Sequence, residues 1–157
     1  MSLRNILFGK YREKVLSNII CNEIEKLENL KKKKKIKIID YGSGYNPEVI
    51  KRIIMSLKSK YKKTNFVAHC FDYYNNEQIK KMNIDKNIKF FHINKLKKKK
   101  ISKFDFCLLL DVLHHIGIDK NKNEIYKVTK RLSKISKFIF IKDHFQYGFF
   151  SNFVLIL

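Results

Sequence analysis

Several features are scarce in this sequence of 157 residues, and each gap excludes a class of protein. The three cysteines, Cys21, Cys70 and Cys107, have no metal-binding spacing, and two of them lie in apolar runs that predict buried thiols. No apolar run reaches the length of a membrane span, and the amino terminus lacks the apolar core of a signal peptide. These absences indicate a cytoplasmic protein without a membrane span or a metal site.

Acidic residues are also few, 14 against 35 basic residues, which gives a formal net charge of +21. Only Arg4, Arg12, Arg52 and Arg131 supply the guanidinium fork that suits phosphate recognition, and the other basic residues are Lys. We therefore interpret the excess of Lys mainly as a compositional bias, with a dedicated nucleic-acid surface as the alternative. Any nucleic-acid contact through the Lys runs is expected to be non-specific and to weaken steeply with salt.

The order of the apolar segments predicts a single α/β domain. Short apolar runs predict five strands, at 36–40, 65–71, 88–93, 104–110 and 138–141. A segment of helical periodicity at 3–30 precedes the first run. Further helices are expected between the runs, at 47–60, at 76–82 as a polar helix, and after a cap at Asp119. We treat 1–35 as an amino-terminal helix with a Lys-rich linker, and 36–157 as the main domain. The alternation predicts a doubly wound, mainly parallel sheet of about five strands with helices on both faces.

Polar residues follow the end of every predicted strand. The residues at or just past these ends are Asp40, Asp72, Asn94, Asp111 and Asp143. In parallel sheets, ligands bind beyond the carboxyl ends of the strands. Gly42 and Gly44 stand between the first strand and its helix, where glycine lets the backbone approach a ligand, although an ordinary turn explains a lone Gly-x-Gly equally well. The pattern favours a ligand site at this edge of the sheet.

Three segments resemble motifs of the class I S-adenosylmethionine-dependent methyltransferases. Ile-Ile-Asp-Tyr-Gly-Ser-Gly at 38–44 is similar to the first motif, and Phe71-Asp72 stands where that family has an acidic residue. The most specific match is Phe-Asp-Phe-Cys-Leu-Leu-Leu-Asp-Val-Leu-His-His at 104–115. The resemblance covers about 36–145. It implies a Rossmann-like fold, S-adenosyl-L-methionine as the cofactor, and transfer of a methyl group to a small-molecule acceptor.

The resemblance also implies roles for the residues at the strand ends, and each role has a structural alternative. Gly42 and Gly44 would let the methionine part of the cofactor lie close to the backbone. Asp40 would bind the amino group of that part, or else it would orient the loop. Asp72 would bind the ribose hydroxyls or else cap the next helix. The remaining cofactor residues would be Tyr73 against adenine, Asn94 at the adenine edge, and Asp111; for Tyr73 and Asn94 the alternatives are ordinary packing and a turn.

Methyl transfer needs a general base only when the acceptor carries a proton. The candidate groups at the strand ends are Asp111, His114, His115, Asp143 and His144. We select His144, Asp143 and His115 as catalytic candidates, with a structural role as the alternative for His115. No Asn-Pro-Pro-Tyr-type segment follows the fourth strand, which argues against methylation of amino groups on nucleic-acid bases or protein glutamine.

The sequence departs from the family pattern in several places. Asn46 replaces the third motif glycine, Ser136-Lys137 replaces a glycine pair, and the final hairpin is missing, so we expect a domain shortened at its carboxyl terminus. We expect 148–157 to form a helix that leaves the edge of the sheet open, which would favour self-association. The alternative functions are a catalytically incomplete cofactor-binding module, a basic RNA-associated module, or a nicotinamide-dependent oxidoreductase, although the last would need a fuller glycine fingerprint.

Overall fold

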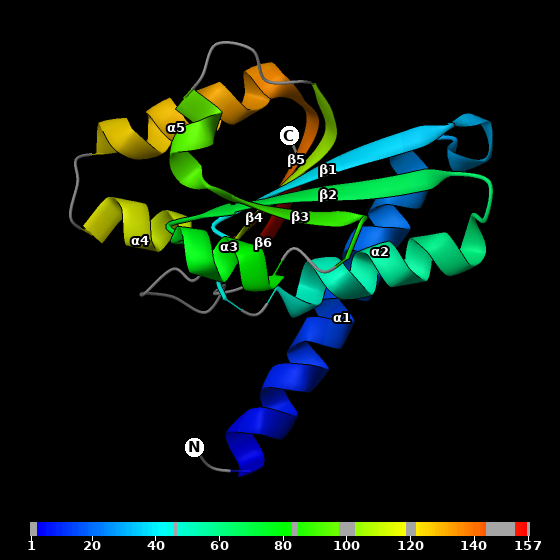
Figure 1. The fold of residues 1–157 in the computed structure, drawn as a ribbon, viewed down its shortest axis with the longest axis horizontal. Coiled ribbons are helices and arrows are strands. Elements are labelled where there is room, and N and C mark those ends of the chain that lie inside the picture. The colour runs from blue at the N-terminus through cyan, green and yellow to red at the C-terminus, as the bar shows by residue number, and fades with distance from the viewer. Residues whose placement is uncertain are drawn as a thin grey trace.

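The structure is a computed structural model that describes residues 3–45, 47–82, 85–97, 103–118, 122–143 and 153–156. Its centre is a six-stranded sheet of order β3-β2-β1-β4-β5-β6 (Figure 1). The strands are β1 (Lys35–Tyr41), β2 (Asn65–Asp72), β3 (Ile88–His92), β4 (Phe104–Leu110), β5 (Ser136–Asp143) and β6 (Phe153–Ile156). The first five pair in parallel, which confirms the predicted Rossmann-like α/β sheet.

Helices cover both faces of this sheet (Figure 1). One face carries α1 (Leu3–Leu27), α2 (Glu48–Lys60) and α3 (Asn76–Met82), and the opposite face carries α5 (Lys122–Ile135). The short helix α4 (Leu113–Ile118) follows β4, and two 3-10 helices lie at Leu30–Lys32 and Ile93–Lys97. The sheet therefore separates two hydrophobic clusters, as expected for strands that are apolar on both faces.

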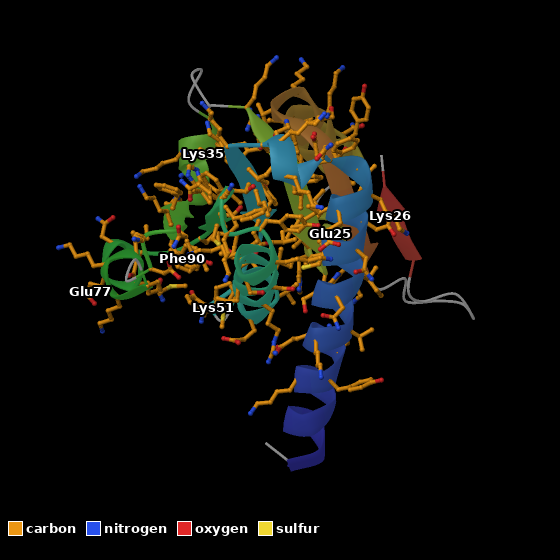
Figure 2. The ribbon with its side chains drawn as sticks, turned by 90° about the vertical axis from the view of Figure 1, so that its right-hand side faces the viewer. Glu25, Lys26, Lys35, Lys51, Glu77 and Phe90 are labelled. Atoms are coloured by element: carbon orange, nitrogen blue, oxygen red, sulfur yellow. The ribbon has the colours of Figure 1, made fainter. Side chains whose placement is uncertain are left out.

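The apolar periodicity of α2 explains its place on the sheet. Ile50, Ile53, Ile54 and Leu57 recur at three- and four-residue steps, and all four are buried. Helix α1 packs against α2 and adds Ile20 and other apolar side chains to the same cluster. The amino-terminal part of α1 extends beyond the sheet (Figures 1 and 2).

Most elements form where the sequence predicts them, with small shifts at their ends. Helix α3 and strand β4 have the predicted bounds, whereas the first helix ends at Leu27 rather than at residue 30. The third strand ends at His92, because the chain turns into a 3-10 helix at Ile93. Helix α4 was not predicted, and both Asn46 and the predicted cap at Asp119 lie outside the described residues.

The prediction of a helix with an open sheet edge at the carboxyl terminus is wrong. Residues Phe153–Ile156 form β6, which runs antiparallel to β5 and pairs with it from Phe140 to Asp143. The four apolar residues of β6 are too few to show either period clearly, and the unpaired groups of β5 offer them backbone partners. The edge that was expected to promote self-association is therefore paired along this stretch.

The two ends of the sheet differ in character. Figure 2 shows Lys35, at the start of β1, above Lys51, which lies in the first turn of α2 after the end of β1. The Lys-rich segments at 31–35 and 62–63 precede β1 and β2, so they lie at the amino edge, away from the strand ends that carry the polar residues. No helix among the described residues is long and apolar enough to cross a membrane.

Candidate functional site

The glycine loop after β1 is held by backbone and side-chain hydrogen bonds from the end of β2. Gly42 and Gly44 both have positive φ, +74° and +64°, a conformation that other residues adopt at a cost. The N–H of Gly42 donates to the carbonyl of Phe71 at 2.8 Å. Asp72 accepts the N–H of Gly44 at 2.7 Å through Oδ2 and the N–H of Tyr73 at 2.7 Å through Oδ1. Asp72 therefore fixes the loop and keeps lone pairs for a ligand hydroxyl.

Tyr74 is a second brace on the same loop, and the sequence analysis missed it. Its buried hydroxyl donates to the carbonyl of Gly44 at 2.5 Å and lies 2.6 Å from the Ser43 hydroxyl. Its ring packs edge-on against Tyr45 and Phe90. Burial raises the pKa of the Tyr74 hydroxyl, so the group stays protonated and able to donate. A tyrosine two residues after Asp72 gives no sequence signal of this contact.

Close packing against the start of α4 explains why position 42 is glycine. A Cβ on Gly42 would lie 2.5 Å from Cγ2 of Val112, whereas a Cβ on Gly44 would meet nothing within 4 Å. The glycine loop and the Val112 segment therefore lie in direct contact at the carboxyl edge. Two of the segments that resemble methyltransferase motifs thus meet in space.

Asp40 is a buried carboxylate in the wall of a cavity. It is 5% exposed, and the cavity is also lined by Arg12, Gly42, Ser43, Glu48 and Asp111. Burial, followed by the charge of Asp72, raises the pKa of Asp40 from 3.8 to about 7. Within the described part of the chain, no hydrogen bond to this carboxylate offsets its burial. A cationic ligand group in the cavity would supply that compensation.

Arg12 brings a positive charge to this first cavity from helix α1. Its Nη2 lies 2.8 Å from Oδ2 of Asp111, whose other oxygen contacts the ammonium of the buried Lys142. Asp111 has a positive φ of 55°, which aspartate tolerates better than most residues. The cavity thus contains both a guanidinium and carboxylates. That pairing complements the two charged ends of an amino acid, and Arg12 is far from the motifs in sequence.

A second cavity opens on the other face of the sheet, and Tyr41 is one of the residues that line it. Tyr73, Asn94 and Arg131 line it, together with apolar side chains from the 3-10 helix Ile93–Lys97 and from α5: Ile93, Leu96, Val128 and Leu132. Tyr73 is 73% exposed, and its ring meets His92 edge-on. An aromatic and apolar wall with one amide suits a planar heterocycle such as adenine. Sequence reasoning identified Tyr73 and Asn94 but missed Arg131, which comes from α5.

Among the catalytic candidates, the structure pairs Asp143 with His114 instead of His115. Oδ1 of Asp143 lies 2.5 Å from Nδ1 of His114, and Oδ2 accepts the His114 N–H at 3.0 Å. His115 lies beside this pair, with 4.0 Å between the two ring centres. His144 lies outside the described residues. His114 was in the wider set of candidates, but only the meeting of β5 with α4 distinguishes it from its neighbour.

The two cavities differ in the chemical groups that line them. The first cavity carries charges for the amino-acid end, and the second has walls suited to adenine. Consecutive residues of β1, Asp40 and Tyr41, line different cavities, and Asp72 holds the glycine loop that follows them. A ligand with a charged end, a dihydroxylated sugar and a planar base could therefore span the carboxyl edge.

Comparisons with known proteins support the fold. No family model and no curated protein matches the chain. Among solved structures, a protein assigned to the class I S-adenosylmethionine-dependent methyltransferases of Listeria monocytogenes matches at TM-score 0.55 and 13% identity, over 82% of this chain and 45% of that chain. A SAM-dependent methyltransferase from Archaeoglobus fulgidus matches at TM-score 0.52 and 14% identity, over 92% of this chain and 60% of that one.

A third match is coclaurine N-methyltransferase bound to N-methylheliamine and S-adenosylhomocysteine, at TM-score 0.50 and 12% identity, over 82% of this chain and 35% of that chain. This chain spans less than two thirds of the length of each of these three structures. At such identities the likeness concerns the fold. The described chain therefore has the fold of class I S-adenosylmethionine-dependent methyltransferases.

Proposed function

We propose that this protein is an S-adenosylmethionine-dependent methyltransferase that binds its cofactor at the carboxyl edge of the sheet. The observation that carries the proposal is the pair of cavities lined by the consecutive residues Asp40 and Tyr41 at the end of β1, next to the braced glycine loop. The uncompensated Asp40 suits the ammonium group of the cofactor, and Arg12 suits its carboxylate. The fold of the solved structures named above is consistent with this reading.

The proposed chemistry asks little of the protein beyond binding and alignment. The bound sulfonium supplies an activated methyl group, so the protein must orient the acceptor and exclude water. We propose Tyr73 and Asn94 as contacts for the adenine, and Asp72 as the acceptor of ribose hydroxyl hydrogen bonds. The acceptor is proposed to be a small molecule that enters beside Asp111 and the start of α4.

Calorimetry with S-adenosylhomocysteine tests this proposal directly. We expect binding to the wild-type chain and none to nicotinamide adenine dinucleotide. Asp72→Ala should weaken binding by about 1.5–3 kcal/mol, because it removes charge-assisted hydrogen bonds. Asp105→Ala is a matched control, since Asp105 accepts the N–H of Lys37 at the opposite edge of the sheet. Binding of the dinucleotide in place of S-adenosylhomocysteine, or equal losses in both variants, would contradict the assignment.

A further inference from the structure

We propose that the outer face of helix α1 binds the same face of a second copy of this chain, with the two helices antiparallel. The inference goes beyond the proposed function and does not depend on it. It begins from three large apolar side chains of α1 that remain exposed: Tyr11 at 69%, Val15 at 39% and Ile19 at 41%.

These three side chains form one stripe along α1. They are four residues apart, so they lie next to one another on a single side of the helix. The side of α1 that packs into the core carries other residues, namely Leu16, Ile20 and Ile24. The amino-terminal part of α1 also extends beyond the sheet (Figures 1 and 2), which leaves this side of the helix accessible. An exposed apolar stripe of this kind is typical of a helix that packs against a partner.

The same face of α1 also carries a hollow that suits Tyr11. The hollow lies toward the carboxyl end of the helix, and its lining continues the stripe from Ile19: Ile19, Asn22, Glu23, Glu25 and Lys26. An apolar side chain, the stem of a lysine and polar acceptors together suit the apolar ring and the hydroxyl of a tyrosine. When two copies run antiparallel, each Tyr11 faces the hollow of the other copy, whereas a parallel pair places Tyr11 against Tyr11.

The charges of α1 favour the same antiparallel arrangement. Three basic residues and one acid lie around Tyr11 in the sequence: Lys10, Arg12, Lys14 and Glu13. The hollow has two acids, Glu23 and Glu25, and one lysine. These acids contact exposed lysines, and such exposed pairs are weak enough to be exchanged for cations of a partner. An antiparallel pair places the basic half of each helix beside the acidic half of the other, whereas a parallel pair places like charges together.

The net charge of the chain explains why two copies should meet at this face. With a formal net charge of +21, two copies repel each other over most of their surfaces. The chain has only 14 acidic residues, and two of them line the hollow beside the exposed Ile19. This face therefore combines apolar surface with the negative charge that the basic half of a second α1 requires.

Analytical ultracentrifugation of the full chain without cofactor tests the dimer. We expect a concentration-dependent dimer, and Ile19→Lys should raise its dissociation constant at least about tenfold, because the substituted residue occurs twice in a symmetric interface. Tyr126→Lys is the matched control, since it replaces another exposed apolar side chain with the same charge but lies on α5, at the opposite face of the sheet. It should leave the dissociation constant unchanged.

Three results would overturn the proposal. They are a wild-type chain that stays monomeric, equal dissociation constants for the wild-type chain and Ile19→Lys, and a monomer that binds vesicles of anionic lipid through the same stripe.

Cysteine crosslinking tests the direction of the two helices. Asn18 is exposed and lies near the middle of the face, close to the proposed two-fold axis, so a short bis-maleimide reagent should join two copies of Asn18→Cys. It should not join two copies of Lys26→Cys, since these positions would lie more than about 20 Å apart in an antiparallel pair. The wild-type chain, whose three cysteines are buried, gives the background. Crosslinking of Lys26→Cys as efficient as that of Asn18→Cys would indicate parallel helices and overturn the proposed arrangement.

Discussion

Asp40 and Asp143 are both buried carboxylates at the carboxyl edge of the sheet, yet their surroundings differ. Asp143, at the end of β5, shares both oxygens with His114. Asp40, on β1, faces the negative charge of Asp72, and its pKa is raised to about 7, first by burial and then by that charge. One carboxylate is satisfied within the protein, whereas burial of the other is uncompensated in the described chain.

The same difference distinguishes two regions at the carboxyl edge of the sheet. At the ends of β1 and β2, Asp72 and Tyr74 hydrogen-bond to the glycine loop, and the buried carboxylate of Asp40 has no hydrogen bond among the described residues. The ends of β4 and β5 carry side chains paired with each other, such as Asp111 with Lys142. Buried polar groups are normally hydrogen-bonded, and Asp40 departs from this rule in the wall of a cavity. The two regions therefore differ in whether their buried carboxylates have partners among the described residues.

The largest expected effect comes from removing the charge of Asp40. A rise of the pKa from 3.8 to about 7 corresponds to a free-energy difference on the order of 4 kcal/mol. Because the folded state holds the Asp40 proton more tightly, stability should be full below pH 4 and should be lost as pH rises toward 7. Asp40→Asn should remove this contribution and stabilise the unliganded protein at pH 8.

Urea unfolding at several pH values between 4 and 8 measures this effect. Asp143→Asn provides the opposite case, because it weakens the contacts with His114 and should destabilise the chain by about 1–3 kcal/mol. If Asp40→Asn retained the pH dependence of the wild-type chain, or if both variants shifted stability in the same direction, the contrast between the two carboxylates would be wrong.

The next effect tests whether the two regions are held together through Gly42. Gly42→Ala should destabilise the fold by about 3 kcal/mol, since its Cβ would overlap the stiff Val112 side chain and its φ is positive. Gly44→Ala is the matched control, with a similar φ but no atom within 4 Å of the added Cβ, and should cost about 1 kcal/mol. Thermal unfolding of both variants measures the difference, and equal losses would show that the contact with Val112 is unimportant.

The smallest effect concerns the brace on the glycine loop. Tyr74→Phe removes the hydroxyl that contacts Gly44 and Ser43, and should cost about 1 kcal/mol of stability. It should also weaken the binding of S-adenosylhomocysteine, because part of the binding free energy is then needed to order the loop. Tyr45→Phe is the control, since Tyr45 is exposed and meets Tyr74 only through its ring. Calorimetry measures the change in binding affinity and chemical unfolding measures the change in stability. Together they would show whether Tyr74 orders the glycine loop before a ligand binds.

The sequence predicted the fold well because its signals are local. The buried strand 104–110 is apolar except for Asp105, and α2 repeats its apolar residues at helical spacing, so both appear in the structure as predicted. The strand ends also predicted which acids gather at the carboxyl edge, since parallel strands bring their ends to one side. The prediction for β6 failed because four apolar residues fit either a helix or a strand. The pairing with β5 decided that they form a strand.

The sequence by itself determined the order of the elements, the glycine turn and the set of polar residues at one edge. Only the tertiary structure decided which of those residues meet. Arg12 reaches Asp111 across 99 positions, and Asp143 selects His114 over the adjacent His115 because α4 presents that ring to the end of β5. Periodicity reports which face a residue occupies, whereas such contacts depend on how separate elements pack. The partners of a charged side chain are therefore fixed only when the chain has folded.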